Sequence, residues 1–456
     1  MLRSGSFAAS FSALLITCAL SAPCVQAGLG GLGQQRAVGG VMIAPDGRVR
    51  AATAKEQKEM ASIIAGAVGQ PAGELAESTD RRVVSLKKLQ QAINEAQQTG
   101  GRTNPEVEFL AGLQRVQYVI VDESNQDILL AGPAEPWTLK ADGSVVGRVS
   151  GQSVMRLEDL MSAFRSVETA REVGGIRCSI EPTADGRQRL QQYLSRVRLG
   201  PGQNPKFLEA GMREAFGPQQ ILIDGVAKDS RLARTLVAAD FEMKRIAMGL
   251  VDSPVPGLPS YLEMARNTRQ TAGQNPRWWM ACDYEPIARN DTGDVWKLSG
   301  PGVKTMTEQD ITQADGSTVG AGRTDQLAQD WADKMTERYE MLSKSKPIFR
   351  DLRNVMDMVV VATLIRQQDL DQVSGLDLAV LRGETGGVES IEFNMPKSLE
   401  PQCSFVRGNV GWTVTASGGV DVNAFLVVQD QVRDPSLGTL VADRRRESAR
   451  WWWNAD

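Results

Sequence analysis

The stretch that decides the fold is QQILIDGVAKDSRLARTLVAADFEMKRIAMGL, residues Gln219–Leu250. Its first part, residues 219–226, is rich in aliphatic residues and predicts a strand. Asp229 or Ser230 then suits the N-cap of the longest clear helix pattern in the chain. Asp240 and Lys244 are four residues apart in this helix and predict an ordinary ion pair. The apolar residues recur in steps of four and three, which places them on one helix face: Leu232, Leu236, Ala239, Met243, Ile246 and Leu250.

Strand and helix patterns alternate immediately before this stretch. Ile176–Ile180 predicts a strand, and the apolar residues from Leu190 to Val197 predict a helix after it. Asn204-Pro205 is typical of the start of a second helix, with the proline at its first position, and Gly217-Pro218 ends that helix. The order strand, helix, helix, strand, helix predicts an α+β or α/β layer at the centre of the chain.

Hairpin signals flank this centre. Val41–Ile43 and Val49 enclose a Pro45-Asp46-Gly47 turn, and Cys403–Val428 predicts strands with a turn at Gly418-Gly419. We therefore expect an α+β fold of several modules, with hairpin-rich N- and C-terminal parts around the strand-helix-helix-strand-helix centre. The predicted segments are a signal peptide (1–27), a Gly-rich leader (28–40), an N-terminal α+β module (41–172), a central α/β module (173–270), a strand and helical-pair module (271–400), C-terminal strands (401–443) and an Arg/Trp-rich tail (444–456).

The N-terminus has the three parts of a secretory signal peptide. Arg3 supplies a positive start, Phe7–Leu20 is almost free of charge, and Val25-Gln26-Ala27 is a small-residue cleavage site. We expect cleavage near Ala27 and export to the periplasm or the medium. Lipidation of Cys24 is the alternative, which Pro23 directly before it fits poorly.

The composition is that of a mildly acidic globular protein. The chain carries a net charge of −4, and loss of Arg3 with the signal peptide leaves −5. This sign argues against nucleic acid as the partner. No later segment has the roughly 18 uninterrupted apolar residues that a membrane helix needs. The best candidate, Val355–Ile365, is short and contains Asp357, so we expect a buried helix there.

The chain contains no histidine. Ser-His-Asp and Cys-His nucleophile systems are therefore excluded, and so are zinc sites that depend on histidine, which three scattered cysteines do not replace. Any catalysis must use carboxylates, Lys, Tyr or an oxygen-ligated metal. The sequence favours a protein without catalysis and predicts neither a cofactor nor a metal.

Three cysteines remain in the mature chain, because Cys18 and Cys24 leave with the signal peptide. An odd number permits at most one disulfide within the chain. Cys178 and Cys282 lie in strand-like sequence and are the predicted pair. Three buried free thiols, Cys403 included, are the alternative.

The candidate catalytic residues are Asp283 and Glu285, in a stretch that runs from Trp279 to Glu285. If this stretch is a strand, Trp279, Asp283 and Glu285 lie on the same face of the sheet, because successive side chains alternate between the two faces. The Cα atoms of Asp283 and Glu285 would then lie about 6.5 Å apart along the strand, which is near the separation of the two carboxyl groups in glycoside hydrolases. The alternative is a solvated sheet face, with Met280 and Cys282 directed to the core.

Candidate binding residues come from two stretches with an Arg-Trp-Trp core. They are Trp278 and Trp279 after Arg277, and Trp451, Trp452 and Trp453 after Arg450. Tryptophan clustered with arginine is typical of recognition surfaces. The alternative for the tail is that its tryptophans dock on the body of the protein.

The junction between the strand and helix of residues 219–250 is a further place to expect a ligand, since strand ends that lead into helix starts are favoured ligand positions. Asp229 at this helix start repels anions. Asp224 and Asp229 suit a hard cation. A helix cap with ion pairs to Lys228 and Arg231 is the preferred interpretation.

Several motifs between Phe216 and Met306 resemble a planctomycete-type family of secreted proteins that is known only as a domain of unknown function. They are Phe216-Gly217-Pro218-Gln219, Asp229-Ser230-Arg231, Ala239–Leu250, Arg277-Trp278-Trp279 and Gly300–Lys304. The resemblance implies secretion and an intact fold, and it implies no catalytic or binding residue.

Together these patterns predict an exported protein that is non-enzymatic, with a binding or structural role in the periplasm or cell envelope. Its expected partner is a cell-envelope protein or a glycan. The alternative is a carboxylate-dependent hydrolase that acts on glycans through Asp283 and Glu285.

Overall fold

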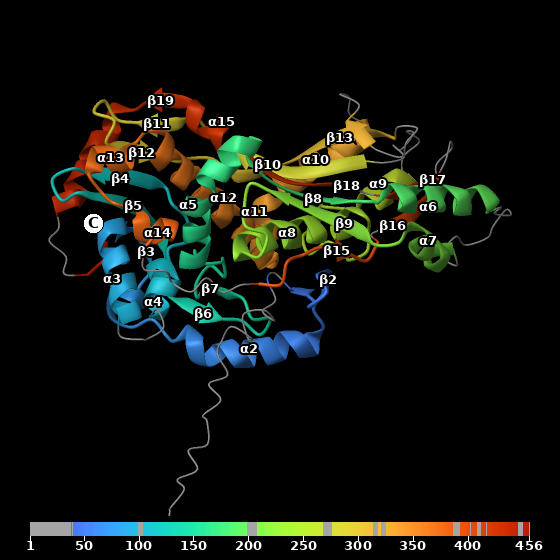
Figure 1. Ribbon diagram of the computed structural model, residues 1–456, viewed down its shortest axis with the longest axis horizontal. Coiled ribbons are helices and arrows are strands. Elements are labelled where there is room, and N and C mark those ends of the chain that lie inside the picture. Colours follow the sequence, from blue (N-terminus) through green and yellow to red (C-terminus); the bar gives the residue numbers. More distant parts are fainter. Residues whose placement is uncertain are drawn as a thin grey trace, which may run out of the picture.

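The computed structural model describes residues 38, 40–98, 104–197, 208–267, 276–312, 318–320, 325–385, 393–401, 403–407, 412–415, 417–445 and 450–455. The predicted signal peptide, Cys24 and nearly all of the Gly-rich leader lie outside these residues. Two large sheets carry most of the strands, and helices α5 (Leu157–Val173) and α12 (Pro347–Gln367) lie between them (Figure 1). The predicted α+β class is confirmed.

The larger sheet joins strands from distant parts of the chain. β18 pairs in parallel with β10 and antiparallel with β8, so it lies between them. In spatial order the strands are β1 (Val41–Ile43), β2 (Arg48–Ala51), β15 (Ser398–Leu399), β9 (Gln219–Asp224), β8 (Ile176–Glu181), β18 (Ser417–Val422), β10 (Pro276–Asp283), β13 (Gly302–Thr312) and β14 (Thr318–Gly320).

The second sheet has seven strands, and two short ribbons accompany the sheets. Its order is β19 (Gln431–Arg433), β11 (Ile287–Arg289), β12 (Val295–Lys297), β4 (Tyr118–Asp122), β5 (Asp127–Ala134), β3 (Thr79–Ser85) and β20 (Trp452–Asn454). The ribbons are β6 (Trp137–Leu139) with β7 (Val145–Gly147), and β16 (Cys403–Arg407) with β17 (Trp412–Thr415).

The remaining helices cover the sheets and fill the space between them. None of the helices within the described residues has both the length and the apolar character that a membrane crossing needs. They are α2 (Ala54–Val68), α3 (Leu86–Gln98), α4 (Pro105–Glu108), α6 (Ala184–Arg196), α7 (Glu209–Phe216), α8 (Arg231–Ala247), α9 (Tyr261–Asn267), α10 (Gln326–Glu337), α11 (Tyr339–Ser345), α13 (Leu370–Ser374), α14 (Ala379–Arg382) and α15 (Ala424–Gln429), with 3-10 turns at Gly73–Ala76, Leu110–Gly112 and Pro435–Arg445.

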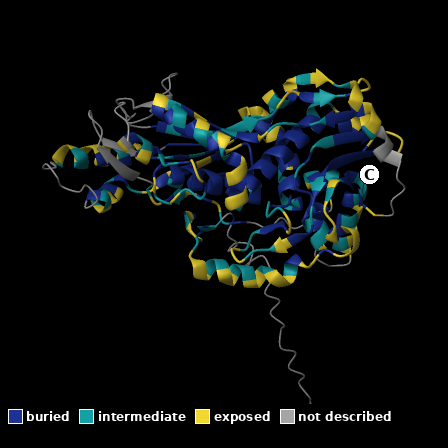
Figure 2. Ribbon diagram, turned by 180° about the vertical axis from the view of Figure 1, so that it is seen from behind, coloured by how far each residue is buried: buried dark blue, intermediate teal, exposed yellow. Residues whose placement is uncertain are grey.

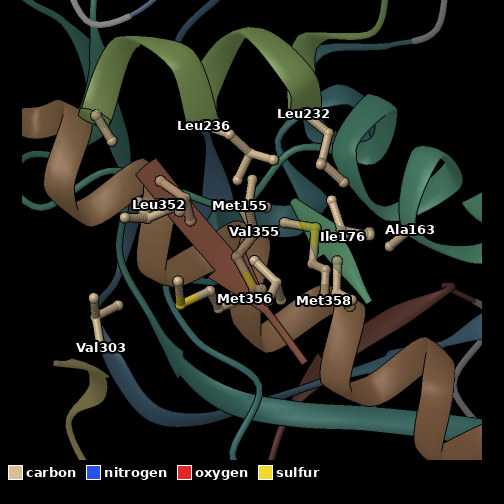
Figure 3. Packing of buried hydrophobic residues seen from close by; sticks show 14 of the residues in the cluster. Met155, Ala163, Ile176, Leu232, Leu236, Val303, Leu352, Val355, Met356 and Met358 are labelled. Carbon is tan, nitrogen blue, oxygen red and sulfur yellow. The ribbon is translucent and has the colours of Figure 1, made fainter. Parts of the chain in front are cut away.

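Helix α12 is the centre of the hydrophobic core. Val355–Ile365, predicted as a buried helix, is buried along its whole length. Leu352 and Val355 of α12 approach Leu236 of α8 (Figure 3). The same helix packs against α5 and α15. Figure 2 shows the resulting buried interior and the more exposed outer helices.

The stretch Gln219–Leu250 folds largely as its pattern predicts. Burial alternates along β9, and Ser230 Oγ accepts a hydrogen bond from the backbone N–H of Ala233 at 3.1 Å, which caps α8. The helix itself is more deeply buried than its apolar stripe predicts, since 16 of its 17 residues are buried. It packs on β8 and β18 on one side and on α12 on another.

Lys244 joins α8 to the larger sheet. Its ammonium group donates to Asp240 Oδ2 at 2.9 Å, to the Ile180 carbonyl at 3.2 Å and to the Gly418 carbonyl at 2.9 Å. Both charged side chains have 0% exposure. The pair that the spacing predicts is therefore confirmed, but it is a buried connection to β8 and β18 and not a surface ion pair.

The predicted turn at Gly418-Gly419 is wrong, because both glycines lie inside β18. A Cβ atom at Gly418 would lie 1.6 Å from the Trp278 carbonyl oxygen, and one at Gly419 would lie 1.7 Å from the Cys178 carbonyl oxygen. These glycines allow close backbone approach on both sides of β18. The prediction of strands up to Val428 also fails at its end, since Ala424–Gln429 is helix α15.

The predicted disulfide between Cys178 and Cys282 is also wrong, since both are free thiols. β18 separates their strands, which places the cysteines at least about 10 Å apart across the sheet. A disulfide requires Cα atoms within about 7 Å. The side chain of Cys403 lies outside the described part of the structure.

We expect Lys244→Met to lower the free energy of unfolding by about 3–5 kcal/mol, because it leaves Asp240 and two carbonyl groups without their buried donor. Lys55→Met is the matched control, since the Lys55 side chain is 84% exposed, and it should change stability by less than about 1 kcal/mol. Urea unfolding measures both. Equal stability of the two variants would contradict the role given to Lys244.

The same pair predicts a pH dependence. Burial raises the pKa of Asp240 to about 7, although Lys244 opposes the shift. In this pH range the folded protein keeps a proton on Asp240 that the unfolded chain releases. The contribution of this proton to the free energy of unfolding is therefore lost as the pH rises from about 4 to about 7. Relative to Asp240→Asn, wild-type stability should fall over this range by about 1 kcal/mol or more. Parallel urea curves at each pH test this, and a constant difference would contradict it.

Candidate functional site

A cavity of about 350 Å³ lies where α2, the β6–β7 turn and the starts of α5, α8 and α12 meet. This volume lies in the range of small-molecule sites. Its wall combines apolar and charged side chains. Residues that line it include Gln57, Met60, Ile64 and Val68 of α2, Glu108 and Phe109, Asp142–Val145, Arg156 and Glu158, Arg231, Ser345–Ile348, Asp351 and Phe393.

Helix α2 forms the outer wall and is held at both ends. At its start Thr53 and Glu56 form a capping box, and Arg50 donates to Glu56 Oε2 at 2.9 Å. At its end the indole N–H of Trp137 donates to the Val68 carbonyl at 3.0 Å. Much of the helix between these points is exposed (Figure 2). Its amphipathic pattern therefore directs Met60 and its neighbours into the cavity.

Cations stand at all three helix starts that reach the cavity. Arg156 is the N-cap of α5 and Lys346 the N-cap of α12, and neither helix has a side-chain cap. Arg231 is the first residue of α8, after the cap Ser230. A helix N-terminus carries partial positive charge, so cations there oppose the dipole. The helix dipoles therefore add positive potential to this part of the cavity, whose described lining side chains include four carboxylates and three cations.

The acidic groups of the cavity wall have cationic partners within the protein. Arg231 donates to Asp159, and its Nη2 lies 2.9 Å from Asp351 Oδ2 and its Nε 3.4 Å from Glu158 Oε1. Burial lowers the pKa of Arg231, but these carboxylates outweigh burial and raise it above its ordinary value. Lys346 donates to Glu242 Oε1 at 2.7 Å. These carboxylates are therefore not free bases.

Among the described residues, no carboxylate is hydrogen-bonded to two further arginines in this region, Arg156 and Arg234. The Arg156 guanidinium lies over the Phe109 ring, 5.2 Å from its centroid, and its nearest carboxylate oxygen, on Glu108, is 3.7 Å away. Arg234 is 2% exposed and lies 4.7 Å from the ring centroid of Phe393. Within the described part of the chain, none of its three guanidinium nitrogens has a hydrogen-bond partner.

The electrostatic surroundings of both arginines reflect this lack. Burial, followed by the charge of Arg231, lowers the pKa of Arg156. Burial lowers the pKa of Arg234 to about 10, and Glu158 only partly opposes this. A buried cation without a hydrogen-bonded anion is costly. Both guanidinium groups thus have donors that no described residue accepts within hydrogen-bond distance.

The structure places the predicted catalytic stretch in β10 and just after it. Asp283 lies 3.7 Å from Lys304 Nζ in an ion pair, and Glu285 is exposed. Tyr284 between them donates to Asp357 Oδ1 of α12 at 2.7 Å. Asp357 in turn binds Arg115 Nε at 2.9 Å. This stretch connects the sheet to the core, and its carboxylates do not line the cavity described above.

The predicted binding tryptophans are mostly buried. Trp278 has 0% exposure, packs on Tyr261 and Trp331 and donates to the Ala328 carbonyl, while Trp279 on the opposite face is half-buried. The tail tryptophans Trp451, Trp452 and Trp453 are at most 7% exposed, and β20 pairs with β3. The tail thus docks on the body as an edge strand of the second sheet.

The predicted cation position at Asp224 and Asp229 has no ligand set around it. Asp224 is exposed, and the Asp229 carbonyl accepts the backbone N–H of Phe393 at 3.0 Å. Within the described residues, no group of three or more Cys, Asp or Glu side chains is placed to hold a metal ion. The same junction, however, delivers Arg231 to the cavity.

Sequence reasoning missed the cavity because eight separate stretches of the chain line it. One signal was present: cations at the start of predicted helices contradict the helix dipole, and local rules are broken mainly at strained or functional sites. Arg231 and Arg234 in the first turns of α8 carry this signal.

Residues 178–261 match a family model described as a protein of unknown function (DUF1598). The match runs from β8 into the start of α9 and so includes α8 and the strands next to it. It confirms the predicted resemblance to a domain of unknown function for the motifs between Phe216 and Leu250, whereas Arg277-Trp278-Trp279 and Gly300–Lys304 lie outside the matched residues. No curated protein and no solved structure gives a significant match.

We expect Trp452→Ala to lower the free energy of unfolding by about 3–5 kcal/mol, because it empties a buried position. The Trp452 ring lies between two guanidinium groups, 5.1 Å from Arg82 and 5.3 Å from Arg450. Trp279 lies on a half-buried sheet face, so Trp279→Ala should lower the free energy of unfolding by clearly less. Urea midpoints compare the two, and an unchanged midpoint for Trp452→Ala would contradict docking of the tail.

Proposed function

We propose that this protein is exported and works without catalysis, as a ligand-binding protein of the periplasm or cell envelope, and that its ligand occupies the cavity beneath α2. The observation that carries the proposal is the cavity of about 350 Å³, whose wall combines apolar side chains with the Arg156 guanidinium, which makes no hydrogen bond to a described residue. Apolar pockets with a few convergent polar groups are the usual form of small-molecule sites.

The chemistry of the cavity wall favours binding over catalysis. General acid–base catalysis needs a group that exchanges protons within reach of the substrate. The chain has no histidine, and Glu158 and Asp351 are engaged by Arg231. The predicted signal peptide supports export. Because the predicted partner belongs to the cell envelope, we expect the ligand to be a component of the cell envelope.

The alternative function, a glycan hydrolase that uses Asp283 and Glu285, stays a prediction. Asp283 is paired with Lys304, and the neighbouring Tyr284 connects the stretch to the core. The geometry gives the hydrolase no specific support, so the binding function is preferred.

The test compares two tryptophan substitutions on α2. Ala67 lines the cavity and Ala65 is exposed on the outer face of the same helix. Ala67→Trp should fill the cavity, whereas Ala65→Trp should leave it open. Wild type and both variants are purified from the native host, denatured, and their extracted small molecules are identified by mass spectrometry. We expect a compound that wild type and Ala65→Trp retain and Ala67→Trp lacks.

Identical extracts from all three proteins would contradict a ligand in this cavity. Recovery of the protein from the cytosol with residues 1–27 still attached would contradict export. Circular dichroism of the two variants checks that both retain the wild-type helix content.

A further inference from the structure

We infer that the ligand of the cavity is a small anionic amphiphile, whose carboxylate or phosphate head binds Arg156 and whose apolar chain lies along α2. This inference rests on the ligand-binding function proposed above and specifies the chemistry of the ligand. It follows from a comparison of the hydrogen-bonding groups of the cavity that have partners within the protein with those that have no partner among the described residues.

The first step concerns the acceptors, which the protein already occupies. Glu158 and Asp351 contact Arg231, and Glu108 forms an ion pair with Arg156 at 3.7 Å. Asp142 Oδ1 accepts from the Ser144 backbone N–H at 3.0 Å and from its hydroxyl at 2.6 Å. A cationic ligand would have to displace these contacts. The count of charges alone therefore does not decide the sign of the ligand.

The second step concerns Arg156, whose donors are unused. Its guanidinium makes no hydrogen bond to any described residue, and its side chain is only 13% exposed. The 3.7 Å distance to Glu108 exceeds the usual hydrogen-bond length of about 2.7–3.2 Å, so Glu108 offsets charge without filling the donors. Packing over Phe109 orients the planar fork, and such a fork suits a two-oxygen anion.

The third step concerns the further positive groups near Arg156, which are Arg234 and the N-termini of α5 and α8. Arg234 lies under Phe393, which lines the cavity, and its own donors have no partner among the described residues. The starts of α5 and α8 add the positive ends of two helix dipoles. An anion at Arg156 therefore supplies the hydrogen-bonded partner that Arg156 lacks among the described residues, and its charge also offsets the buried charge of Arg234.

The last step concerns the rest of the ligand. Met60, Ile64 and Val68 of α2 give the cavity an apolar wall, and Ile348 adds a further apolar side chain from the start of α12. A cavity of 350 Å³ has room for about ten non-hydrogen atoms at the ~30 Å³ that each water takes in the liquid. A head group with a short chain fits this space, whereas a bare inorganic anion leaves the apolar wall uncovered.

The test is calorimetric titration of the full mature protein with five probes: octanoate, octyl phosphate, octanol, octylamine and acetate. We expect octanoate or octyl phosphate to bind at least tenfold more tightly than octanol, octylamine or acetate. The better of the two anionic probes identifies the head group. Arg156→Gln should weaken that binding at least tenfold, and Arg156→Lys should weaken it less.

Arg148→Gln is the matched control, because Arg148 is exposed and close in sequence, and it should bind like wild type. Equal binding of octanol or octylamine would overturn the anionic head group, and equal binding of acetate would overturn the apolar chain. In both cases the cavity would still be a binding site. Absence of binding by every probe would also overturn the inference, and the extraction experiment with Ala67→Trp then decides separately whether the proposed function stands.

Discussion

The buried ammonium group of Lys244 is the constraint on which the architecture depends. It fixes α8 against β8 and β18 through carbonyl groups of Ile180 and Gly418, which belong to segments far apart in the chain. An ammonium ion buried to 0% exposure is tolerated only because each of its donors has an acceptor. The opposite end of the same rigid helix places Arg231 in the cavity wall and Arg234 against Phe393, which also lines the cavity. The fixed position of the helix thus determines where the cations of the candidate site lie.

Local patterns predicted the parts of the fold that local interactions determine. The helix period from Leu232 to Ile246, the cap at Ser230 and the apolar run at Val355–Ile365 appear where expected, because cap geometry and helix periodicity depend on neighbours in sequence. Leu250, the last residue of the predicted stripe, lies beyond the end of α8. The neighbours of β18 were not predictable in this way. Gly418-Gly419 has the composition of a turn, and only the backbones of β8 and β10 on either side explain why glycine is required. The free state of Cys178 and Cys282 depends on the same non-local arrangement.

The candidate site was still less predictable. No single segment contains a recognisable motif, and its charged groups come from α5, α8, α12 and the residues around Phe109. Carboxylates and aromatic rings that lie close together in sequence are typical of functional sites, and this pattern predicted roles for Asp283, Glu285 and the tryptophans. Trp278 and Trp452 are instead core residues. The residue types were informative about chemistry, but burial decided which of them remain available to a ligand.

The central place of β18 has a consequence for how the chain reaches its native state. β8 and β10 both pair with β18, which lies well over a hundred residues further along the chain. Proteins dominated by such distant contacts fold slowly. Until β18 inserts, both strands expose unpaired edges, which are sites of intermolecular association. The time between collapse and insertion is therefore the period in which this protein is most prone to aggregate, and a holdase chaperone would have its greatest effect then.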